Sequence, residues 1–315
     1  MPLFPLIGLV LVLITFHGSV SAATFNVDST DDFVDKVIGD GVCATEFNTC
    51  TLRAAVQEAN ASNTWPNIIS LPAGNYILNY GSANEGASAE GDLDIKKPLE
   101  IVGEDPATTI IDGNNSDRIF DIKYGAGYSH SYKDPIEWVK IKNITLQNGS
   151  VDLSNGGAIL SYENLLIDNV VFKNNSVTNI DQSSSGFRGG AIYTSSRLEV
   201  YNSIFSFNSA EGNGGALYSN GMVIIKDSTF DNNTAVSGGA IDGGFRNGTF
   251  SNLVISNNIA TQDGGGLKAK GTFTDIIVTN NSAKYGGGIY LTESSNVYSS
   301  IIYQNNSDEY GGGVY

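Results

Sequence analysis

The chain has few of the residues on which most catalysis and metal binding depend. Its 315 residues include two histidines and two cysteines. One histidine, His17, lies in an apolar N-terminal stretch, which leaves His130 as the only other histidine. His130 is flanked by serines within a segment rich in Tyr, Ser and Gly. We therefore expect no Ser-His-Asp or Cys-His catalytic centre, and we assign no catalytic residue.

Positive charge is also scarce. The chain has 17 Lys and Arg against 33 Asp and Glu, which leaves a formal net charge of −16. Such acidity repels nucleic acids and anionic lipid headgroups, so we expect neither as a partner. Solubility alone explains it, and we predict no cofactor and no dedicated metal site. Binding of Ca²⁺ to carboxylates is the one alternative left open.

The first 22 residues contain no Lys, Arg, Asp or Glu. Their apolar run, Leu6–Phe16, is too short to span a bilayer, and Val20-Ser21-Ala22 offers the small residues that signal peptidase requires. We expect residues 1–22 to be a signal peptide that is removed before Ala23, with no membrane span after it. The protein is therefore expected to be secreted or to reside on the cell surface.

The two cysteines, Cys43 and Cys50, lie close together in the sequence. In an exported protein such a pair is expected to form a disulfide. A metal site is the weaker alternative, because no histidine or third cysteine lies nearby to complete it. On the chain-entropy model, closing so short a loop stabilises the fold by about 2–3 kcal/mol.

A single clear helix is expected in the exported chain, over residues 51–61. Its apolar residues form one stripe with the spacing i, i+3, i+4 and i+7: Leu52, Ala55, Val56 and Ala59. Thr51 is a suitable N-cap for this helix. Together with the cysteine loop, the helix is expected to form an N-terminal cap over residues 23–66.

From residue 148 onward the sequence repeats itself about every 25 residues. Two glycines, then Ala or Gly, then Ile, Leu or Val begin at seven positions: Gly156, Gly189, Gly214, Gly238, Gly264, Gly286 and Gly311. An asparagine column keeps step with this motif: Asn148, Asn175, Asn208, Asn233, Asn258, Asn281 and Asn306. A fixed period in this range is the signature of a stacked repeat.

One repeat, residues 189–213, contains three strand-like runs: Gly189–Tyr193, Leu198–Tyr201 and Ile204–Phe207. Three short strands and three turns in about 25 residues describe a triangular coil, and such coils stack with parallel strands. We therefore predict an all-β fold, a right-handed parallel β-helix over residues 67–315, with the short helix capping its N-terminal end. The signatures of propeller blades and leucine-rich repeats are absent.

The last motif is followed by Tyr315, where the chain stops within the first strand of a new coil. An uncapped solenoid end exposes core and unpaired backbone. We therefore expect these residues to be the N-terminal part of a longer β-helix, truncated at its C-terminus.

Two columns of side chains are expected to stack along the axis. The asparagines would hydrogen-bond one above another through their amides. The residue after each inward aliphatic would point outward, and at four positions it is a tyrosine: Tyr193, Tyr218, Tyr290 and Tyr315. An aromatic ladder that only stabilises the sheet is the simpler interpretation. The alternative is that these exposed tyrosines face a carbohydrate.

Five stretches near the N-terminus carry a family resemblance: Gly39–Cys43, Cys50–Ala61, Gly91–Ile95, Ile110–Gly113 and Asp117–Phe120. In these the chain resembles the exported bacterial CSLREA-motif β-helix proteins, which have a pectin-lyase-like fold. One position departs from the motif, because its Glu is Ala54 here. The capping box is therefore incomplete, and Thr51 is expected to cap the helix alone.

The repeats carry a second resemblance. Three of them contain Phe-x-x-Asn between Gly-Gly-Ala elements: Phe172–Asn175, Phe205–Asn208 and Phe230–Asn233. In this they are similar to the polymorphic outer-membrane protein repeat. That similarity implies display on the bacterial cell envelope, with the outer membrane as one location, and adhesion.

We therefore expect a non-catalytic adhesion or interaction scaffold whose partner is an extracellular polysaccharide or a host or cell-surface protein. The alternative is a polysaccharide lyase or hydrolase of the pectin-lyase-like fold. A lyase needs Ca²⁺-binding carboxylates and a basic residue, and such groups surround Arg118 in the sequence: Asp92, Asp94, Asp112, Asp117 and Asp121. Aspartates so spaced are also typical of turns and solvated strand faces, and an acidic chain is poorly suited to a polyanionic substrate.

Overall fold

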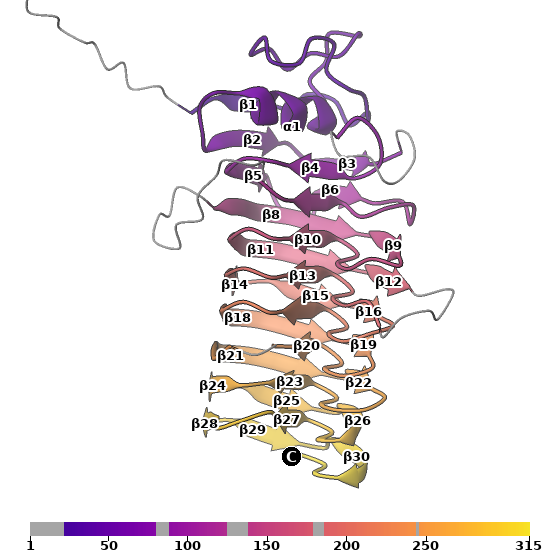
Figure 1. Ribbon diagram of the computed structural model, residues 1–315, viewed down its shortest axis with the longest axis vertical. Helices are drawn as coiled ribbons and strands as arrows, with labels where there is room; N and C mark the ends of the chain where they lie inside the picture. Colours follow the sequence, from indigo (N-terminus) through magenta and orange to yellow (C-terminus); the bar gives the residue numbers. More distant parts are fainter. Residues whose placement is uncertain (1–21, 80–87, 125–137, 179–185, 244–245) are drawn as a thin grey trace, which may run out of the picture.

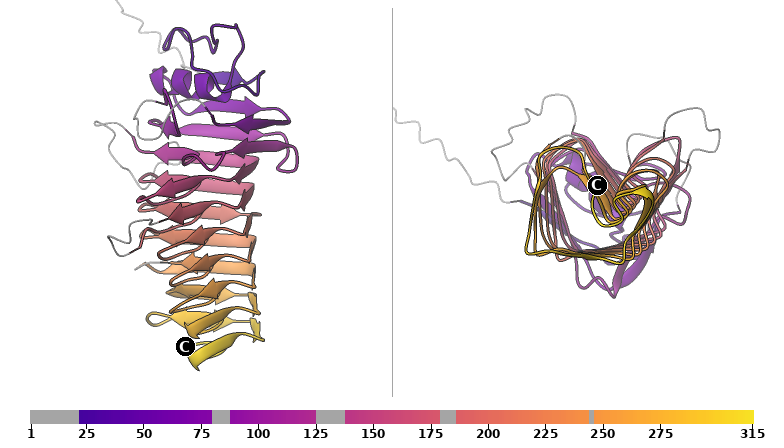
Figure 2. Two further views of the ribbon diagram at one scale, coloured as in Figure 1. Left: turned by 90° about the vertical axis from the view of Figure 1, so that its right-hand side faces the viewer. Right: turned by 90° about the horizontal axis from the view of Figure 1, so that it is seen from below.

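The computed structural model describes residues 22–79, 88–124, 138–178, 186–243 and 246–315. They form one stack of coils, with helix α1 (Leu52–Ala61) across the N-terminal end (Figure 1). Viewed along the axis, the coils superimpose, as expected for a parallel β-helix (Figure 2). His130 and all of the expected signal peptide except Ala22 lie outside the described residues.

Three parallel sheets run along the stack. Sheet A has 15 strands: β1 (Thr24–Asn26), β2 (Asn67–Leu71), β3 (Gly74–Ile77), β5 (Leu99–Gly103), β6 (Thr109–Asp112), β8 (Val139–Gln147), β11 (Leu165–Lys173), β14 (Leu198–Tyr201), β15 (Ile204–Ser206), β18 (Val223–Asp231), β21 (Gly248–Ser256), β24 (Gly271–Thr274), β25 (Ile277–Thr279), β28 (Asn296–Tyr298) and β29 (Ile301–Tyr303). Sheet B has 8 strands: β4 (Leu93–Ile95), β7 (Phe120–Ile122), β10 (Ile159–Ser161), β13 (Ile192–Thr194), β17 (Leu217–Ser219), β20 (Ile241–Asp242), β23 (Leu267–Ala269) and β27 (Ile289–Leu291). Sheet C has 7 strands: β9 (Ser150–Asp152), β12 (Ser176–Thr178), β16 (Ser209–Ala210), β19 (Thr234–Ala235), β22 (Ile259–Ala260), β26 (Ser282–Tyr285) and β30 (Asn306–Tyr310).

Each regular coil visits sheet B, then sheet A, then sheet C. In residues 189–213 these visits are β13, then β14 and β15, then β16. The expected third strand is present as β15, but it does not form the third side of the coil, because it belongs to sheet A together with β14 and the third side is β16 in sheet C. Between β14 and β15, Asn202 has a φ of 50°, in the left-handed region. A single left-handed residue bends the chain without moving it to another sheet. In the sequence, such a bend has the same residue types as a turn between two sheets.

The buried side chains of sheets A and B, with those of α1, form the main hydrophobic core, whereas Val151, Val177 and Ala210 of sheet C form a small cluster of their own. Phe172, Phe205 and Phe230 stack with 4.6 Å between successive ring centroids. Phe250 and Phe273 stack in the same way at 4.7 Å. Coils in parallel register place equivalent inward positions one above another at the ~4.8 Å strand spacing. The ring stacks are therefore a direct consequence of the register.

A ladder of side-chain amides, buried except at its last and partly buried member Asn305, runs beside this core: Asn175, Asn208, Asn233, Asn258, Asn281 and Asn305. Asn208 is typical, because its Oδ1 accepts from both Nδ2 and the backbone N–H of Asn175 at 3.0 Å. Its Nδ2 donates to Asn233 Oδ1 at 3.0 Å and to the Phe172 carbonyl at 3.1 Å. Each rung therefore satisfies backbone groups at a turn where the sheet ladders do not reach.

The ladder differs from the expected asparagine column at both ends. Asn148 is not a member of the ladder, because its φ of 55° makes it the left-handed residue of the turn. The ladder position of this coil is occupied by Gly149, whose backbone N–H donates to Asn175 Oδ1. Asn306 is an exposed residue of β30, and the neighbouring Asn305 occupies the rung. Asparagine suits both the left-handed turn and the rung, so the sequence alone does not separate adjacent positions.

The two glycines of the repeat motif meet different requirements, as Gly214 and Gly215 show. Gly214 has a φ of 70°, which glycine adopts without strain. At Gly215 an added Cβ would lie 2.1 Å from the carbonyl oxygen of Gly239 in the next coil. A side chain there would separate the coils, so the motif marks their closest approach.

Helix α1 covers the first coil, as expected for a cap. Its expected apolar stripe is buried in the main core cluster: Leu52, Ala55, Val56 and Ala59. Thr51 is the N-cap, and its Oγ1 accepts from the backbone N–H of Ala54 at 3.2 Å. None of the helices in the described ranges is long and apolar enough to cross a membrane.

Cys43 and Cys50 form the expected disulfide, in the loop that precedes α1. Residue 50 also binds the segment that follows β1. The backbone N–H of Asp28 donates to the Cys50 carbonyl at 3.0 Å, and the Asp28 carboxylate accepts from the Cys50 N–H at 2.7 Å. These two hydrogen bonds tie the disulfide loop to the segment that follows the first strand of sheet A.

Replacing Asn208 with alanine should lower the free energy of unfolding by about 2–4 kcal/mol. The reason is that the Asn175 amide and the Phe172 carbonyl would stay buried without partners. Chemical denaturation measures the loss. Asn306→Ala is the matched control, because this asparagine lies outside the ladder, and its effect should stay within about 0.5 kcal/mol. Equal effects of the two substitutions would contradict the role assigned to the ladder.

Cys43→Ser should lower the melting temperature under oxidising conditions, because opening the loop restores freedom to the unfolded chain, worth about 2–3 kcal/mol. Thermal unfolding with and without reductant measures the effect. The parent with reductant should melt like the variant without it. An unchanged melting temperature in the variant would show that the bridge does not stabilise the cap.

Candidate functional site

A polar cavity of about 600 Å³ opens between strands of sheets B and C. Sheet B contributes Asp121 from β7 and Leu160 from β10, and sheet C contributes β9. The remaining lining residues lie just before β4 and β7 or just after β9: Asp92, Ser116, Asp117, Arg118 and Ser154. In the described part of the chain, sheet C begins at β9. The cavity therefore lies where the coils first acquire their third sheet.

A tight turn before β7 brings Asp117 and Arg118 to this cavity. Asn114 and Asn115 both adopt left-handed conformations, with φ of 55° and 53°. Asparagine tolerates that region better than most residues. The Ser116 backbone N–H donates to the Gly113 carbonyl at 3.1 Å, which closes the turn, and the Asp117 carboxylate accepts from the Arg118 backbone N–H at 2.7 Å.

Arg118 is the central polar group of the cavity, with its side chain 8% exposed. Its Nη1 lies 2.8 Å from Asp92 Oδ2 and 3.5 Å from Asp121 Oδ2. Its Nη2 donates to Ser154 Oγ at 2.9 Å, and its Nε donates to the Gly156 carbonyl at 3.1 Å. These contacts join the segments before β4 and after β9 around one guanidinium.

Asp92 has the most perturbed carboxyl group of this cluster. Burial raises the pKa of Asp92 from 3.8 to about 7, while Arg118 lowers it and three neighbouring aspartates raise it further. Loss of solvation outweighs the single ion pair, because a buried charge keeps little of its hydration. Asp92 is therefore suited to exchange a proton near neutral pH.

Two carboxylate oxygens of the cavity have no hydrogen-bond partner among the described residues: Asp117 Oδ2 and Asp121 Oδ1. Burial raises the pKa of Asp121, and Arg118 and Lys123 lower it. Buried acceptors without partners are costly. A ligand that donates hydrogen bonds to them would remove this cost.

Three of the five aspartates expected near Arg118 line the cavity: Asp92, Asp117 and Asp121. Asp94 instead accepts from the Ser88 backbone N–H at 2.7 Å, on the side of the cap. Asp112 lies on β6 in sheet A, where it accepts from Asn148 at 3.0 Å. Within the described ranges, no group of three or more potential ligands is placed to hold a metal ion.

The outward column of sheet B continues from the cavity to the tyrosines. The register pairs Asp121 with Leu160, Leu160 with Tyr193, and Tyr193 with Tyr218. The rings of Tyr193 and Tyr218 stack, with 5.5 Å between centroids and an interplanar angle of 11°. Tyr193 therefore lies one coil beyond the cavity in the same outward column.

The expectation of an exposed tyrosine pair is wrong for Tyr218, which is only 3% exposed. Arg188 covers it: the guanidinium lies 4.7 Å from the ring centroid, and Nη1 donates to the phenolic oxygen at 2.8 Å. Tyr193 is half-buried and stays accessible. Arg188 and Tyr218 are 30 residues apart in the sequence, so no local pattern signals their contact.

Tyr290 and Tyr315 lie further along the same face, with 5.2 Å between their ring centroids. Asp242 and Lys268 separate them from Tyr218 in the register of sheet B. Lys268 stands over the Tyr290 ring at 5.4 Å from its centroid. The four tyrosines therefore do not form one continuous surface.

Asp92→Asn should change how stability depends on pH. The pKa of Asp92 in the folded protein is raised from 3.8 to about 7. The stability that Asp92 contributes to the folded state is therefore fully present below about pH 4 and is lost as the pH rises through about 7. Between these limits the parent should lose about 1–4 kcal/mol more than the variant, at about 1.4 kcal/mol for each unit of pKa. Urea denaturation from pH 4 to pH 8 measures this difference. Parallel pH profiles would contradict the raised pKa.

Part of the stack of coils matches a known protein family. A family model described as a right-handed β-helix region matches residues 132–308, and Asp92 and Arg118 precede that range. A search of curated proteins and a search of solved structures each returned no match. Since the model covers more than half of the sequence and agrees with the three stacked sheets, this chain belongs to the right-handed β-helix family.

Proposed function

We propose that this protein is a secreted or cell-surface β-helix that binds an extracellular polysaccharide and acts as an adhesion scaffold. The observation that carries the proposal is the polar cavity of about 600 Å³ around Arg118. Its volume falls within the range of pockets that hold small ligands or segments of larger ones. Export and surface display are part of the proposal and rest on the charge-free apolar N-terminus and the resemblance of the repeats.

The polar groups of the cavity suit a ligand rich in hydroxyl groups. Asp117 and Asp121 line the cavity, and each has a buried carboxylate oxygen that no described residue satisfies. Hydroxyl groups donate to such oxygens, and the gain is large where the acceptor is already buried. Contacts with Asp92 and Ser154 hold the Arg118 guanidinium in place. Little conformational entropy would therefore be lost when a ligand binds.

The charge of the protein favours a neutral glycan over a uronic acid polymer. The whole chain carries a formal charge of −16. Four aspartates line the cavity beside a single arginine: Asp92, Asp117, Asp121 and Asp152. A polyanion approaching this surface would be repelled. Neutral sugars avoid that cost and still satisfy the carboxylates.

Tyr193 supports a binding surface longer than the cavity. It follows Leu160 in the outward column of sheet B, one coil further along the stack. Successive strands lie ~4.8 Å apart, so a glycan chain lying along the axis would meet Asp121, Leu160 and Tyr193 in turn. The accessible ring offers an apolar face on which a sugar ring packs.

A glycoside hydrolase is the second candidate, and the raised pKa of Asp92 favours it. A carboxyl group with a pKa of about 7 keeps its proton near neutral pH and can protonate a glycosidic oxygen. Asp117 and Asp121 are available as the second carboxylate that such chemistry requires. The 2.8 Å contact between Asp92 and Arg118 favours the ionised form and opposes this role. Binding without cleavage is therefore our preferred function.

A panel of neutral and acidic polysaccharides tests both candidates. Immobilised glycans measure binding, and release of reducing ends measures cleavage. The parent should bind at least one neutral polysaccharide, and Asp121→Asn should weaken that binding about ten-fold, the effect of losing one charge-assisted hydrogen bond. Asp112→Asn is the matched control, because Asp112 lies on sheet A outside the cavity. Tyr193→Ala should weaken binding to a smaller extent.

The outcomes separate the two candidates. Equal affinity of the parent and Asp121→Asn would place the ligand elsewhere and contradict binding in the cavity. Binding confined to acidic polysaccharides would contradict the inference of a neutral glycan. Release of reducing ends by the parent but not by Asp92→Asn would replace the scaffold with the hydrolase.

A further inference from the structure

Helix α1 carries a polar stripe, largely buried, beside its apolar one. Arg53, Gln57 and Asn60 follow the spacing i, i+4 and i+7, which places them on one face of the helix. Arg53 is 0% exposed and Gln57 is 3% exposed. Burying such groups is costly unless each finds a partner. Their partners therefore show what this face of the helix supports.

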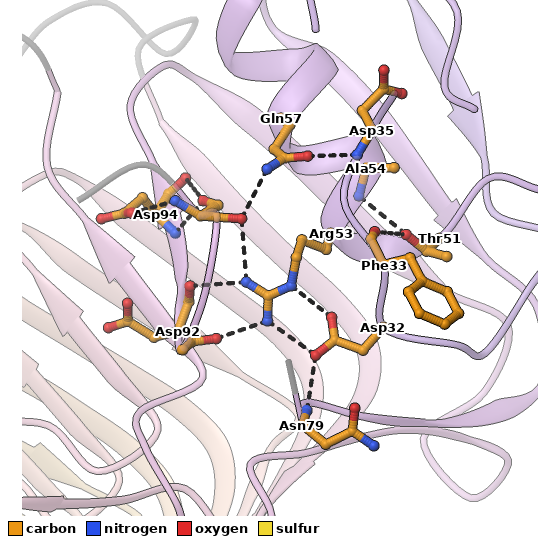
Figure 3. A network of polar contacts seen from close by, with 12 residues as sticks. Asp32, Phe33, Asp35, Thr51, Arg53, Ala54, Gln57, Asn79, Asp92 and Asp94 are labelled. Atoms are coloured by element: carbon orange, nitrogen blue, oxygen red, sulfur yellow. Dashed lines mark hydrogen bonds and ion pairs between the residues drawn. The ribbon is translucent and has the colours of Figure 1, made fainter. Parts of the chain in front are cut away.

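All three side chains bind the backbone of residues 88–94. Arg53 Nη2 donates to the Gly91 carbonyl at 2.8 Å, and its Nη1 donates to the Ser88 carbonyl at 3.2 Å. Gln57 Nε2 donates to the same Ser88 carbonyl at 3.0 Å, and Asn60 Nδ2 donates to the Asp94 carbonyl at 2.7 Å. Figure 3 shows the Arg53 guanidinium between Asp32 and the segment that carries Asp92.

Arg53 is itself held in place from the other side. Asp32 accepts from its Nε at 2.6 Å and from its Nη2 at 3.1 Å, in a bidentate pair (Figure 3). Asp32 also accepts from the Asn79 backbone N–H at 2.8 Å. A bidentate, fully buried pair leaves the guanidinium one orientation. Its remaining donors then point at the carbonyls of residues 88–92.

The register of sheet B does not reach Asp92. Strand β4 pairs with β7 from Leu93 onward, where Leu93 is opposite Phe120. Asp92 comes one residue before this pairing, and its carboxylate meets Arg118 at 2.8 Å. The segment that ends at Asp92 is thus held by the cap helix on one side and ends in the cavity on the other.

We propose that Arg53 and Asn60 are positioning residues that hold the backbone of residues 88–94 and so set where the Asp92 carboxyl meets Arg118 in the cavity. The polar stripe of the cap helix is then part of the ligand site, although neither residue touches the ligand. The inference rests on the proposed function only in treating the cavity as a ligand site. The positioning itself is measured without any ligand.

Glu58 provides the matched comparison within the same helix. It is 1% exposed, and its carboxylate accepts from the backbone N–H groups of Gly39 and Gly41 at 2.5 and 2.9 Å. These partners belong to the cap loop and not to residues 88–94. A general loosening of the cap would follow from changing Glu58 as well as Arg53, whereas loss of positioning would follow from changing Arg53 or Asn60 and not from changing Glu58.

The test compares Arg53→Lys, Asn60→Ala and Glu58→Gln in the full chain. Native-state hydrogen exchange at the amides of residues 93–95, relative to the remote amide of Leu217 in β17, should accelerate about ten-fold in the first two variants only. NMR titration of the Asp92 carboxyl should show its midpoint shifted by about one pH unit or more in the same two variants. Lysine keeps the charge of Arg53 but loses the planar fork that reaches two carbonyls.

Asn60→Ala leaves the pair of Arg53 with Asp32 intact, so it carries the test alone if Arg53→Lys does not fold. The positioning role is overturned if Glu58→Gln changes the exchange and the Asp92 titration as much as the other two variants do. It is also overturned if Asn60→Ala changes neither. A parent that binds no polysaccharide would refute the proposed function and leave the positioning result standing, because neither readout uses a ligand.

Discussion

Stacking of parallel coils in register is the constraint on which the rest of this structure depends. A coil of about 25 residues leaves most of its backbone hydrogen bonds to the coils on either side. Where the strands turn and this pairing stops, the asparagine ladder replaces it, as Asn208 does for Asn175 and the Phe172 carbonyl. The stacked phenylalanines and the close approach at Gly215 follow from the same register, because each inward position recurs at the strand spacing.

The candidate site lies where this regularity begins and not within it. Sheet C starts at β9 in the described chain, and the cavity opens beside this first strand. Strand pairing of β4 also begins only at Leu93, one residue after Asp92. Side chains of α1 then take over the support of the backbone, with Arg53 bound to Asp32 behind it. Polar side chains are found here because a cavity opens between the coils and because α1 provides hydrogen-bond donors for the backbone before β4.

The sequence predicted features that depend on the repeat or on one short segment well, and contacts between distant residues poorly. The stacking of Tyr193 on Tyr218 could be predicted because every coil has the same route through the sheets. The burial of Tyr218 could not, because it depends on Arg188 from another coil. The predicted asparagine column included Asn148 and Asn306, which are not members of the ladder. The reason is that asparagine suits both the left-handed turn and the neighbouring ladder position.

By itself the sequence determined the parallel β-helix, the capping helix and the disulfide, because each depends on a pattern within one repeat or one short segment. Only the tertiary structure decided the cavity. Arg118 meets Asp92 at a separation of 26 residues and Ser154 at 36, and Arg53 reaches Gly91 across 38. The first coils differ in length, so no period relates these positions. Their contacts were decided by how unequal coils pack against each other and against the cap.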